Sequence, residues 1–106
     1  RQAENDYEQL VQRLGQQAQT QAKQLNFASR NMAITDRAYV SAEGNLRSKQ
    51  EEFRNGLVSE TDLAAAELWL IDARIAAFNA RTDYLIRVGD FLGTLAQDPA
   101  VSNLAQ

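Results

Sequence analysis

The side chains that could carry chemistry in this chain are carboxylates and basic groups, because its 106 residues include neither histidine nor cysteine. The 14 acidic and 11 basic residues are spread along the sequence. Acid–base and nucleophilic catalysis need polar groups that converge from different elements, and the chain also lacks a glycine-rich phosphate loop. We therefore predict that the chain is not an enzyme and holds no cofactor or metal.

Two short-range ion pairs are predicted on helix surfaces. Asp83 and Arg87 are spaced i and i+4, which places their side chains on the same face of a helix. Arg54 can pair with Glu51 or Glu60, although an exposed pair of this kind contributes little to stability. These charges are interpreted as solvated helix faces, and a ligand-binding role for Arg54 is the weaker hypothesis.

The distribution of net charge limits the classes of partner. The formal charge is −3, and it divides into roughly +1 through residue 54 and about −4 from residue 55 onward. A nucleic-acid surface needs concentrated basic side chains, so no nucleic-acid partner is expected. No apolar run approaches the length of a membrane-spanning helix, and no signal-peptide pattern opens the chain. The sequence is therefore interpreted as an excised or mature segment.

The elements that position these side chains are predicted by apolar periodicity. One stripe has the spacing of a coiled coil and predicts a helix over about residues 3–54. Its seven-residue positions are Val11, Ala18, Leu25, Met32, Tyr39, Leu46 and Phe53, with Tyr7, Leu14, Ala28 and Ala42 between them. A second stripe predicts a helix over about residues 60–96, and it contains Leu63, Ala66, Leu70, Ala73, Ala77, Ala80, Tyr84 and Phe91.

The turn between the stripes, residues 55–59, has a capping signal on each side. Asn55 and Gly56 are typical of a left-handed carboxyl cap, and Ser59 with Asp62 is typical of a capping box. We therefore predict an all-α fold, a long antiparallel coiled-coil hairpin over residues 1–97. Because Pro99 resists helix continuation, residues 98–106 are predicted to be a short tail.

Both predicted helices carry more apolar surface than one seam can bury. Phe27, Ile34 and Val40 flank the first stripe, and Trp69, Ile71, Ile75 and Phe78 are among those that lie off the second. A helix that is apolar on more than one side has more than one neighbour. We therefore expect self-association, either as a four-helix bundle or as a larger helical assembly.

At the turn the sequence resembles the repeat of the TolC-like outer-membrane efflux proteins. The segment 53–63, FRNGLVSETDL, is similar to the family's run of an aromatic residue, a glycine, a hydroxyl residue and an aspartate followed by an apolar residue. The likeness continues through Ala73-Arg74, through ARTDYL at residues 80–85 and through LGTL at residues 92–95. It covers about residues 50–97, and the glutamine-rich first helix is similar only in pattern.

This resemblance implies a hairpin of the periplasmic α-barrel of a homotrimeric export duct of the outer membrane. The duct would serve multidrug export or type I secretion together with an inner-membrane pump. The turn would be the periplasmic tip, where an adaptor of the membrane-fusion family docks. The implied adaptor-contact residues are Phe53, Arg54, Gly56, Leu57 and Ser59.

The resemblance also implies a carboxylate at the pore entrance, at Asp62. A second gate carboxylate found three residues later in some members is absent, because Ala65 stands there. Capping alone also accounts for Gly56, Ser59 and Asp62, and the heptad alone accounts for Phe53.

Two other readings compete with the export duct. The adaptor also presents a long hairpin, but its tip has leucine four residues after an arginine and serine seven residues after that leucine. Arg54 is followed at those distances by Val58 and Ala65, which disfavours the adaptor. The alternative from a different class is a self-associating coiled-coil scaffold or four-helix-bundle interaction module.

Overall fold

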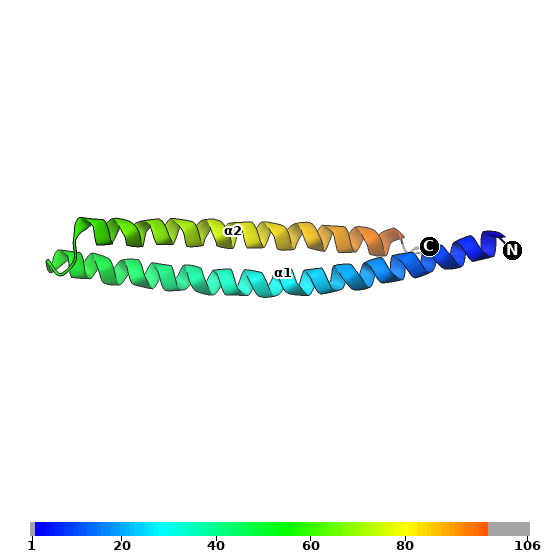
Figure 1. Ribbon diagram of the computed structural model, residues 1–106, viewed down its shortest axis with the longest axis horizontal. Coiled ribbons are helices and arrows are strands. Elements are labelled where there is room, and N and C mark those ends of the chain that lie inside the picture. The colour runs from blue at the N-terminus through cyan, green and yellow to red at the C-terminus, as the bar shows by residue number, and fades with distance from the viewer. Residues whose placement is uncertain (1, 98–106) are drawn as a thin grey trace. The chain divides into compact units, whose positions relative to one another are not determined.

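The computed structural model describes residues 2–97, which form two α-helices joined by a short turn (Figure 1). Helix α1 spans Gln2–Arg54 and helix α2 spans Glu60–Gln97. The predicted all-α antiparallel hairpin is therefore confirmed, and each predicted helix end agrees to within one residue. The predicted tail, 98–106, lies outside the described residues. Over residues 2–97, neither helix contains a stretch long and apolar enough to cross a bilayer.

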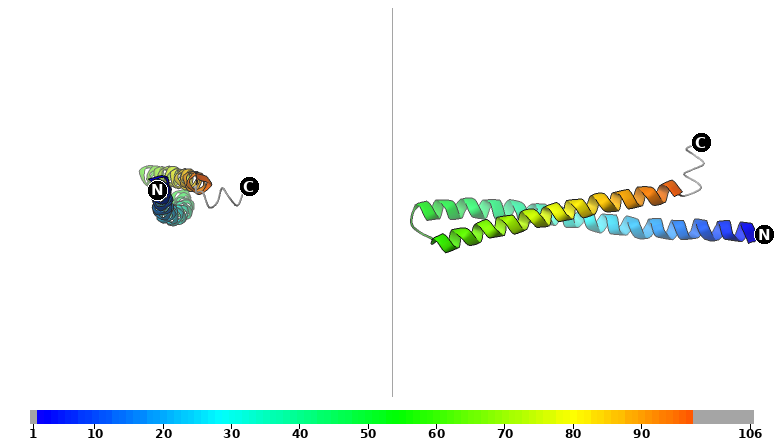
Figure 2. Two further views of the ribbon diagram at one scale, coloured as in Figure 1. Left: turned by 90° about the vertical axis from the view of Figure 1, so that its right-hand side faces the viewer. Right: turned by 90° about the horizontal axis from the view of Figure 1, so that it is seen from above.

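The chain divides into two compact units, which are described separately. The turn unit, Arg30–Thr82, contains the end of α1, the turn and the beginning of α2. The terminal unit contains the beginning of α1 and the end of α2, of which residues 2–29 and 83–97 are described. In each unit the α1 and α2 segments lie side by side and antiparallel (Figure 2).

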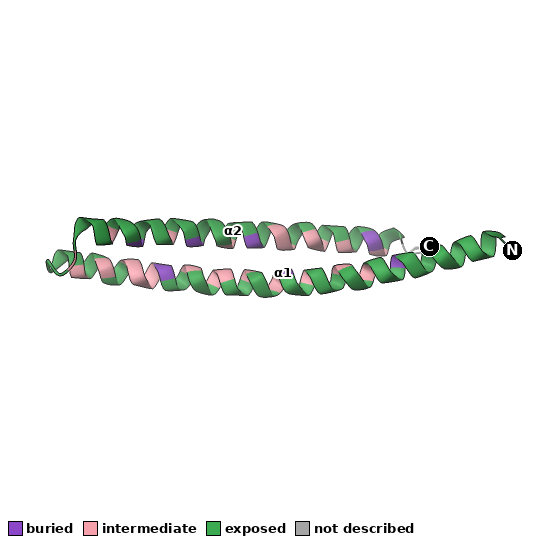
Figure 3. Ribbon diagram, in the orientation of Figure 1, coloured by how far each residue is buried: buried purple, intermediate pink, exposed green. Residues whose placement is uncertain are grey.

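The seam of the turn unit is built on alanines (Figure 3). Ala42, Ala66, Ala73 and Ala80 are buried. The larger seam residues are half-buried, and these are Met32, Tyr39, Leu46, Leu63 and Leu70. Both predicted stripes are thus confirmed in this unit, and the small side chains allow the helix axes to approach closely.

Two side-chain contacts show how α1 and α2 are aligned in the turn unit. The Arg74 Nε donates a hydrogen bond to the Tyr39 hydroxyl at 3.2 Å, and its guanidinium carbon lies 5.6 Å from the centre of the Tyr39 ring. Arg81 pairs with Asp36 at 3.2 Å. The α1 segment 36–39 therefore lies beside the α2 segment 74–81.

Large and small residues alternate along the seam of each helix in this unit. On α1 Ala42 lies between Tyr39 and Leu46, and on α2 Leu70 lies between Ala66 and Ala73. Large and small side chains that alternate across a seam fill it evenly without bringing two large groups together. The alanines therefore set the spacing of the two helices.

The seam of the terminal unit is more polar. Leu14 and Ala28 are buried, as is the polar side chain of Thr94, whose Oγ1 accepts a hydrogen bond from Gln17 Nε2 at 3.4 Å. The Gln21 Oε1 atom is buried and has no hydrogen-bond partner among the described residues. Polar side chains weaken the hydrophobic contribution of this seam, so we infer that it is less stable per layer than the seam of the turn unit.

The first heptads of α1 differ from the prediction. Tyr7 and Val11 were expected in the buried stripe, but they are 53% and 38% exposed. Helix α1 contains 53 residues and α2 contains 38, so α1 extends past the last described turn of α2. The seam on α1 therefore begins at Leu14, where a partner helix is present.

Enlarging a buried alanine should destabilise the hairpin. We expect Ala42→Leu to lower the free energy of unfolding by about 1–3 kcal/mol, because Ala42 is 0% exposed and the seam has no room there for a larger side chain. Urea unfolding followed by circular dichroism at fixed protein concentration measures the change. The control is Ala38→Leu, an exposed position one helical turn away, with an expected change within about 0.5 kcal/mol. Equal effects at both positions would contradict the alanine seam.

Candidate interaction site at the turn

The end of α1 is closed by two backbone hydrogen bonds around Gly56. The Leu57 N–H donates to the Glu52 carbonyl at 2.8 Å, and the Gly56 N–H donates to the Phe53 carbonyl at 3.0 Å. Gly56 has a φ of 72°. This combination is the Schellman motif, in which a residue in the left-handed conformation lets the chain leave the helix. The predicted left-handed cap is confirmed.

The start of α2 is closed by a reciprocal pair of bonds between Ser59 and Asp62. The Asp62 N–H donates to Ser59 Oγ, and the Ser59 N–H donates to Asp62 Oδ2, each at 3.2 Å. The predicted capping box is therefore confirmed. Both side chains act in helix initiation, and because Asp62 remains exposed, its second oxygen is free to face solvent or a partner.

The caps leave an apolar side chain projecting from the turn. In a Schellman motif the residue after the glycine often contacts an apolar residue of the last helical turn. Here that residue is Leu57 and the position it would contact is Glu52, so Leu57 stays 73% exposed. A β-carbon added at Gly56 would meet no atom within 4 Å. The backbone at Gly56 is thus open to close approach.

The five residues predicted as an adaptor-contact set lie together at this turn. Phe53 and Arg54 end α1, Gly56 and Leu57 form the turn, and Ser59 precedes α2, all exposed. Phe53 is 37% exposed, so its ring lies at the edge of the seam and not within it. These residues could present a mixed apolar and backbone surface, whereas no cluster able to hold a metal is present among residues 2–97.

The charged groups near the turn are mostly acidic. Arg54 pairs with Glu51 at 3.6 Å and Lys49 pairs with Glu52 at 3.2 Å. The first of these matches the prediction, and both pairs are too exposed to stabilise the turn appreciably. Glu60 and Asp62 add two further carboxylates at the start of α2. A partner that approaches the turn therefore meets more negative than positive charge.

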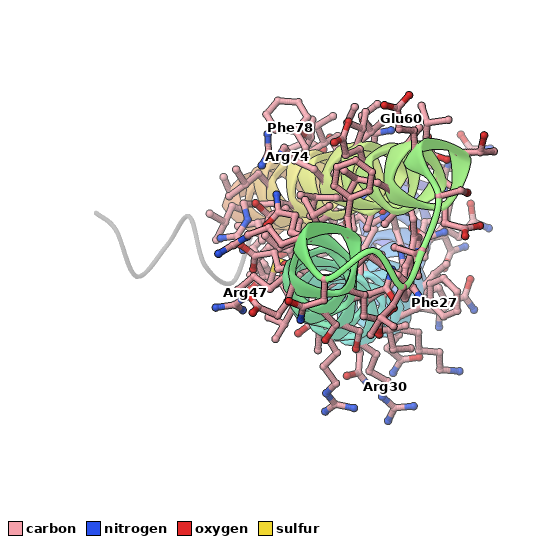
Figure 4. All side chains as sticks on the ribbon, turned by 90° about the vertical axis from the view of Figure 1, so that its left-hand side faces the viewer. Phe27, Arg30, Arg47, Glu60, Arg74 and Phe78 are labelled. Atoms are coloured by element: carbon pink, nitrogen blue, oxygen red, sulfur yellow. The ribbon has the colours of Figure 1, made fainter. Side chains whose placement is uncertain are left out.

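Away from the turn, each unit has large apolar side chains that face solvent. In the turn unit α2 carries a stripe with three- and four-residue spacing, formed by Leu68, Ile71, Ile75 and Phe78, all exposed. Figure 4 shows Phe78 directed outward from α2 and Arg30 directed outward from α1. In the terminal unit, Phe27, Leu85, Ile86 and Leu92 are exposed. The second apolar faces inferred from the sequence are thus unburied in a single copy.

The ion pair predicted within α2 is also present. Arg87 Nε donates to both carboxylate oxygens of Asp83, at 3.2 and 3.1 Å. Arg87 is half-buried, which an apolar repeat does not indicate for a charged residue. Arg87 lies seven residues after Ala80, and this heptad spacing is the signal that could have predicted its partial burial.

Comparison of this chain with protein-family profiles, with curated proteins and with solved structures gives no match. The structure itself shows a long antiparallel two-helix hairpin.

The backbone conformation at the turn predicts opposite effects for two glycine substitutions. Gly56→Ala should lower the free energy of unfolding by about 1–2 kcal/mol, because an L residue resists positive φ. Gly44→Ala should raise it by up to about 1 kcal/mol, since Gly44 lies within α1 and has open space around it. Thermal unfolding of the two variants measures both changes. Changes of the same sign would contradict the assigned cap.

Proposed function

We propose that this chain is a periplasmic hairpin of a TolC-like export duct of the outer membrane, and that its turn docks an adaptor of the membrane-fusion family. The observation that carries the proposal is the exposed turn, where Leu57 projects without an apolar contact and the Gly56 backbone is unobstructed. The motif at residues 53–63 supports the same assignment. An enzymatic role has no comparable support.

Docking at the turn would use three properties of its surface. Leu57 would enter an apolar depression of the adaptor, because burying a leucine side chain contributes about 1.5–3 kcal/mol. The absence of a side chain at Gly56 would allow a helix of the partner to approach the backbone. The excess of carboxylates around the turn favours a partner with basic side chains at the edge of the contact.

The exposed apolar faces support the barrel part of the proposal. The stripe of Leu68, Ile71, Ile75 and Phe78 bears no charge and has no neighbour in a single copy. Exposed patches of this kind mark contact surfaces in soluble proteins. In the proposed homotrimer these faces would be covered by neighbouring hairpins in the periplasm, and an inner-membrane pump would supply the cargo through the adaptor.

Asp62 is proposed as a carboxylate of the pore entrance. Its exposed side chain and its position beside the turn support this role, since a ring of carboxylates disfavours anions. Asp62→Asn keeps an acceptor for the Ser59 N–H while it removes the charge. We expect the assembled duct with this variant to lose selectivity for cations in conductance measurements, and unchanged selectivity would exclude the role.

A bulky residue at the turn should block docking more than folding. In the full-length protein, we expect Gly56→Trp to reduce export and adaptor cross-linking at least about tenfold, because the ring occupies the space needed for backbone approach. A β-carbon at this position has no clash within its own chain, so only the cost of positive φ falls on the fold. Export assays and cross-linking yield measure the effect, and trimer content reports folding.

The control for this experiment is Gly56→Asn. Asparagine tolerates the left-handed conformation and adds little bulk, so docking should be largely retained. If the tryptophan variant cross-links and exports as well as the parent protein, the turn is not the docking site. A loss of trimer in the tryptophan variant would instead show that the turn is needed for assembly.

The exposed stripe on α2 also favours the second candidate, a self-associating scaffold. Both functions require a chain that is not a monomer, because the exposed apolar residues need a second neighbour. Sedimentation equilibrium at micromolar concentration tests this shared requirement. A scaffold needs no adaptor, so adaptor cross-linking that depends on Gly56 separates the two.

A further inference from the structure

The end of α1 contains a pair of residues with a reactivity that helix capping does not use. Asn55 is followed by Gly56, and it is the only asparagine of the chain that precedes a glycine. The backbone nitrogen of the next residue can attack the carboxamide of an asparagine and close a five-membered succinimide ring. A β-carbon on that next residue hinders the approach, so glycine is the neighbour that permits the reaction best.

The carboxamide of Asn55 is not held by other groups. Asn55 is exposed, and within residues 2–97 it forms only one hydrogen bond of its own, from its backbone N–H to the Glu51 carbonyl at 3.2 Å. Its side chain is therefore free to rotate toward the Gly56 nitrogen. Apart from its two chain neighbours, no atom lies within 4 Å of the position that a β-carbon would take at Gly56, so the backbone there is also open to water.

One interaction opposes the attack. The Gly56 N–H donates to the Phe53 carbonyl at 3.0 Å, and this bond has to open before the nitrogen can react. The bond lies at an exposed helix end, where backbone hydrogen bonds open at the lowest cost in free energy. The nearby ion pair of Arg54 with Glu51 is too exposed to hold this turn closed. The cap should therefore slow the reaction without preventing it.

We propose that Asn55 is a site of spontaneous deamidation that changes the turn covalently. A base removes the Gly56 N–H proton, the nitrogen lone pair attacks Cγ of Asn55, and the side-chain nitrogen leaves as ammonia after it has taken up that proton. Solvent water then opens the succinimide ring. Cleavage of the bond from the ring nitrogen to Cγ gives aspartate, and cleavage of its bond to the main-chain carbonyl carbon gives isoaspartate. Either way one carboxylate replaces the amide, and water is the only reagent consumed.

Isoaspartate at this position would loosen the end of α1. Its main chain runs through the former side chain, which adds a methylene group between residue 55 and Gly56. The bonds from Gly56 to Phe53 and from Leu57 to Glu52 both span this point, so the Schellman motif cannot keep its geometry. The new carboxylate also lies at a helix C-terminus, where the helix dipole disfavours negative charge. A resulting loss of adaptor docking rests on the function proposed above, whereas the modification itself does not.

Peptide mapping by mass spectrometry tests the site in the folded chain, incubated at mildly alkaline pH. Asn31 and Asn79 are internal controls, because both are exposed but lie inside α1 and α2 and precede residues that have a β-carbon. We expect Asn55 to deamidate at least about tenfold faster than either control, with isoaspartate detected by a protein isoaspartyl methyltransferase. Equal rates at the three positions would overturn the proposal. The urea-unfolded chain is measured in parallel, and fast reaction of Asn55 only in that state would also overturn it, because the cap would then be protective.

Thermal unfolding of the separated products tests the effect on the turn. At the same protein concentration, the isoaspartate form should melt at least about 4 °C below the parent chain. The matched control is Asn55→Asp, which adds the same charge on a normal backbone and should show less than half of that shift. An isoaspartate form that melts with the parent would overturn the loosening of the turn. Both measurements use this chain alone, so their failure is distinct from a failure of adaptor docking.

Discussion

Close contact across an alanine-lined seam is the constraint on which the rest of the structure depends. The buried seam residues of the turn unit are alanines, and their small side chains let the two helices approach closely. The two helices can then bury their seam although neither has a globular core around it. The other faces of α1 and α2 lie outside this seam, which is why a single copy exposes so many apolar side chains.

The features that the sequence predicts well are those that are local or periodic. The capping box of Ser59 and Asp62 and the cap at Gly56 depend on neighbouring residues, and the stripes depend on a repeat. The exposure of Val11 could not be predicted in this way, because it depends on where the partner helix ends. The contact of Arg74 with Tyr39 also required the register of the two helices, which periodicity alone leaves open by one heptad.

The candidate site shows the same division. The sequence placed its five residues at one turn, and the structure has them there, but their exposure depends on details of the caps. Leu57 projects because Glu52 occupies the position that an apolar residue often takes in this motif. Whether a partner uses that surface is a property of two molecules and is not encoded in the fold of one. The adaptor is a proposed partner that rests on the resemblance to efflux proteins, and the exposed Leu57 and open Gly56 backbone are the features that would suit it.

The polar character of the terminal seam has a kinetic consequence. The bond between Gln17 and Thr94 joins residues separated by 77 positions, whereas the cap at Gly56 joins near neighbours. Closing a long loop is entropically less favourable, and a polar seam offers little hydrophobic energy in return. We therefore expect folding to begin at the turn and proceed outward, with φ-values that fall from Leu46 toward Leu14. The terminal layers would then form last and open first, and they would be the part of the hairpin most readily remodelled by a neighbouring chain.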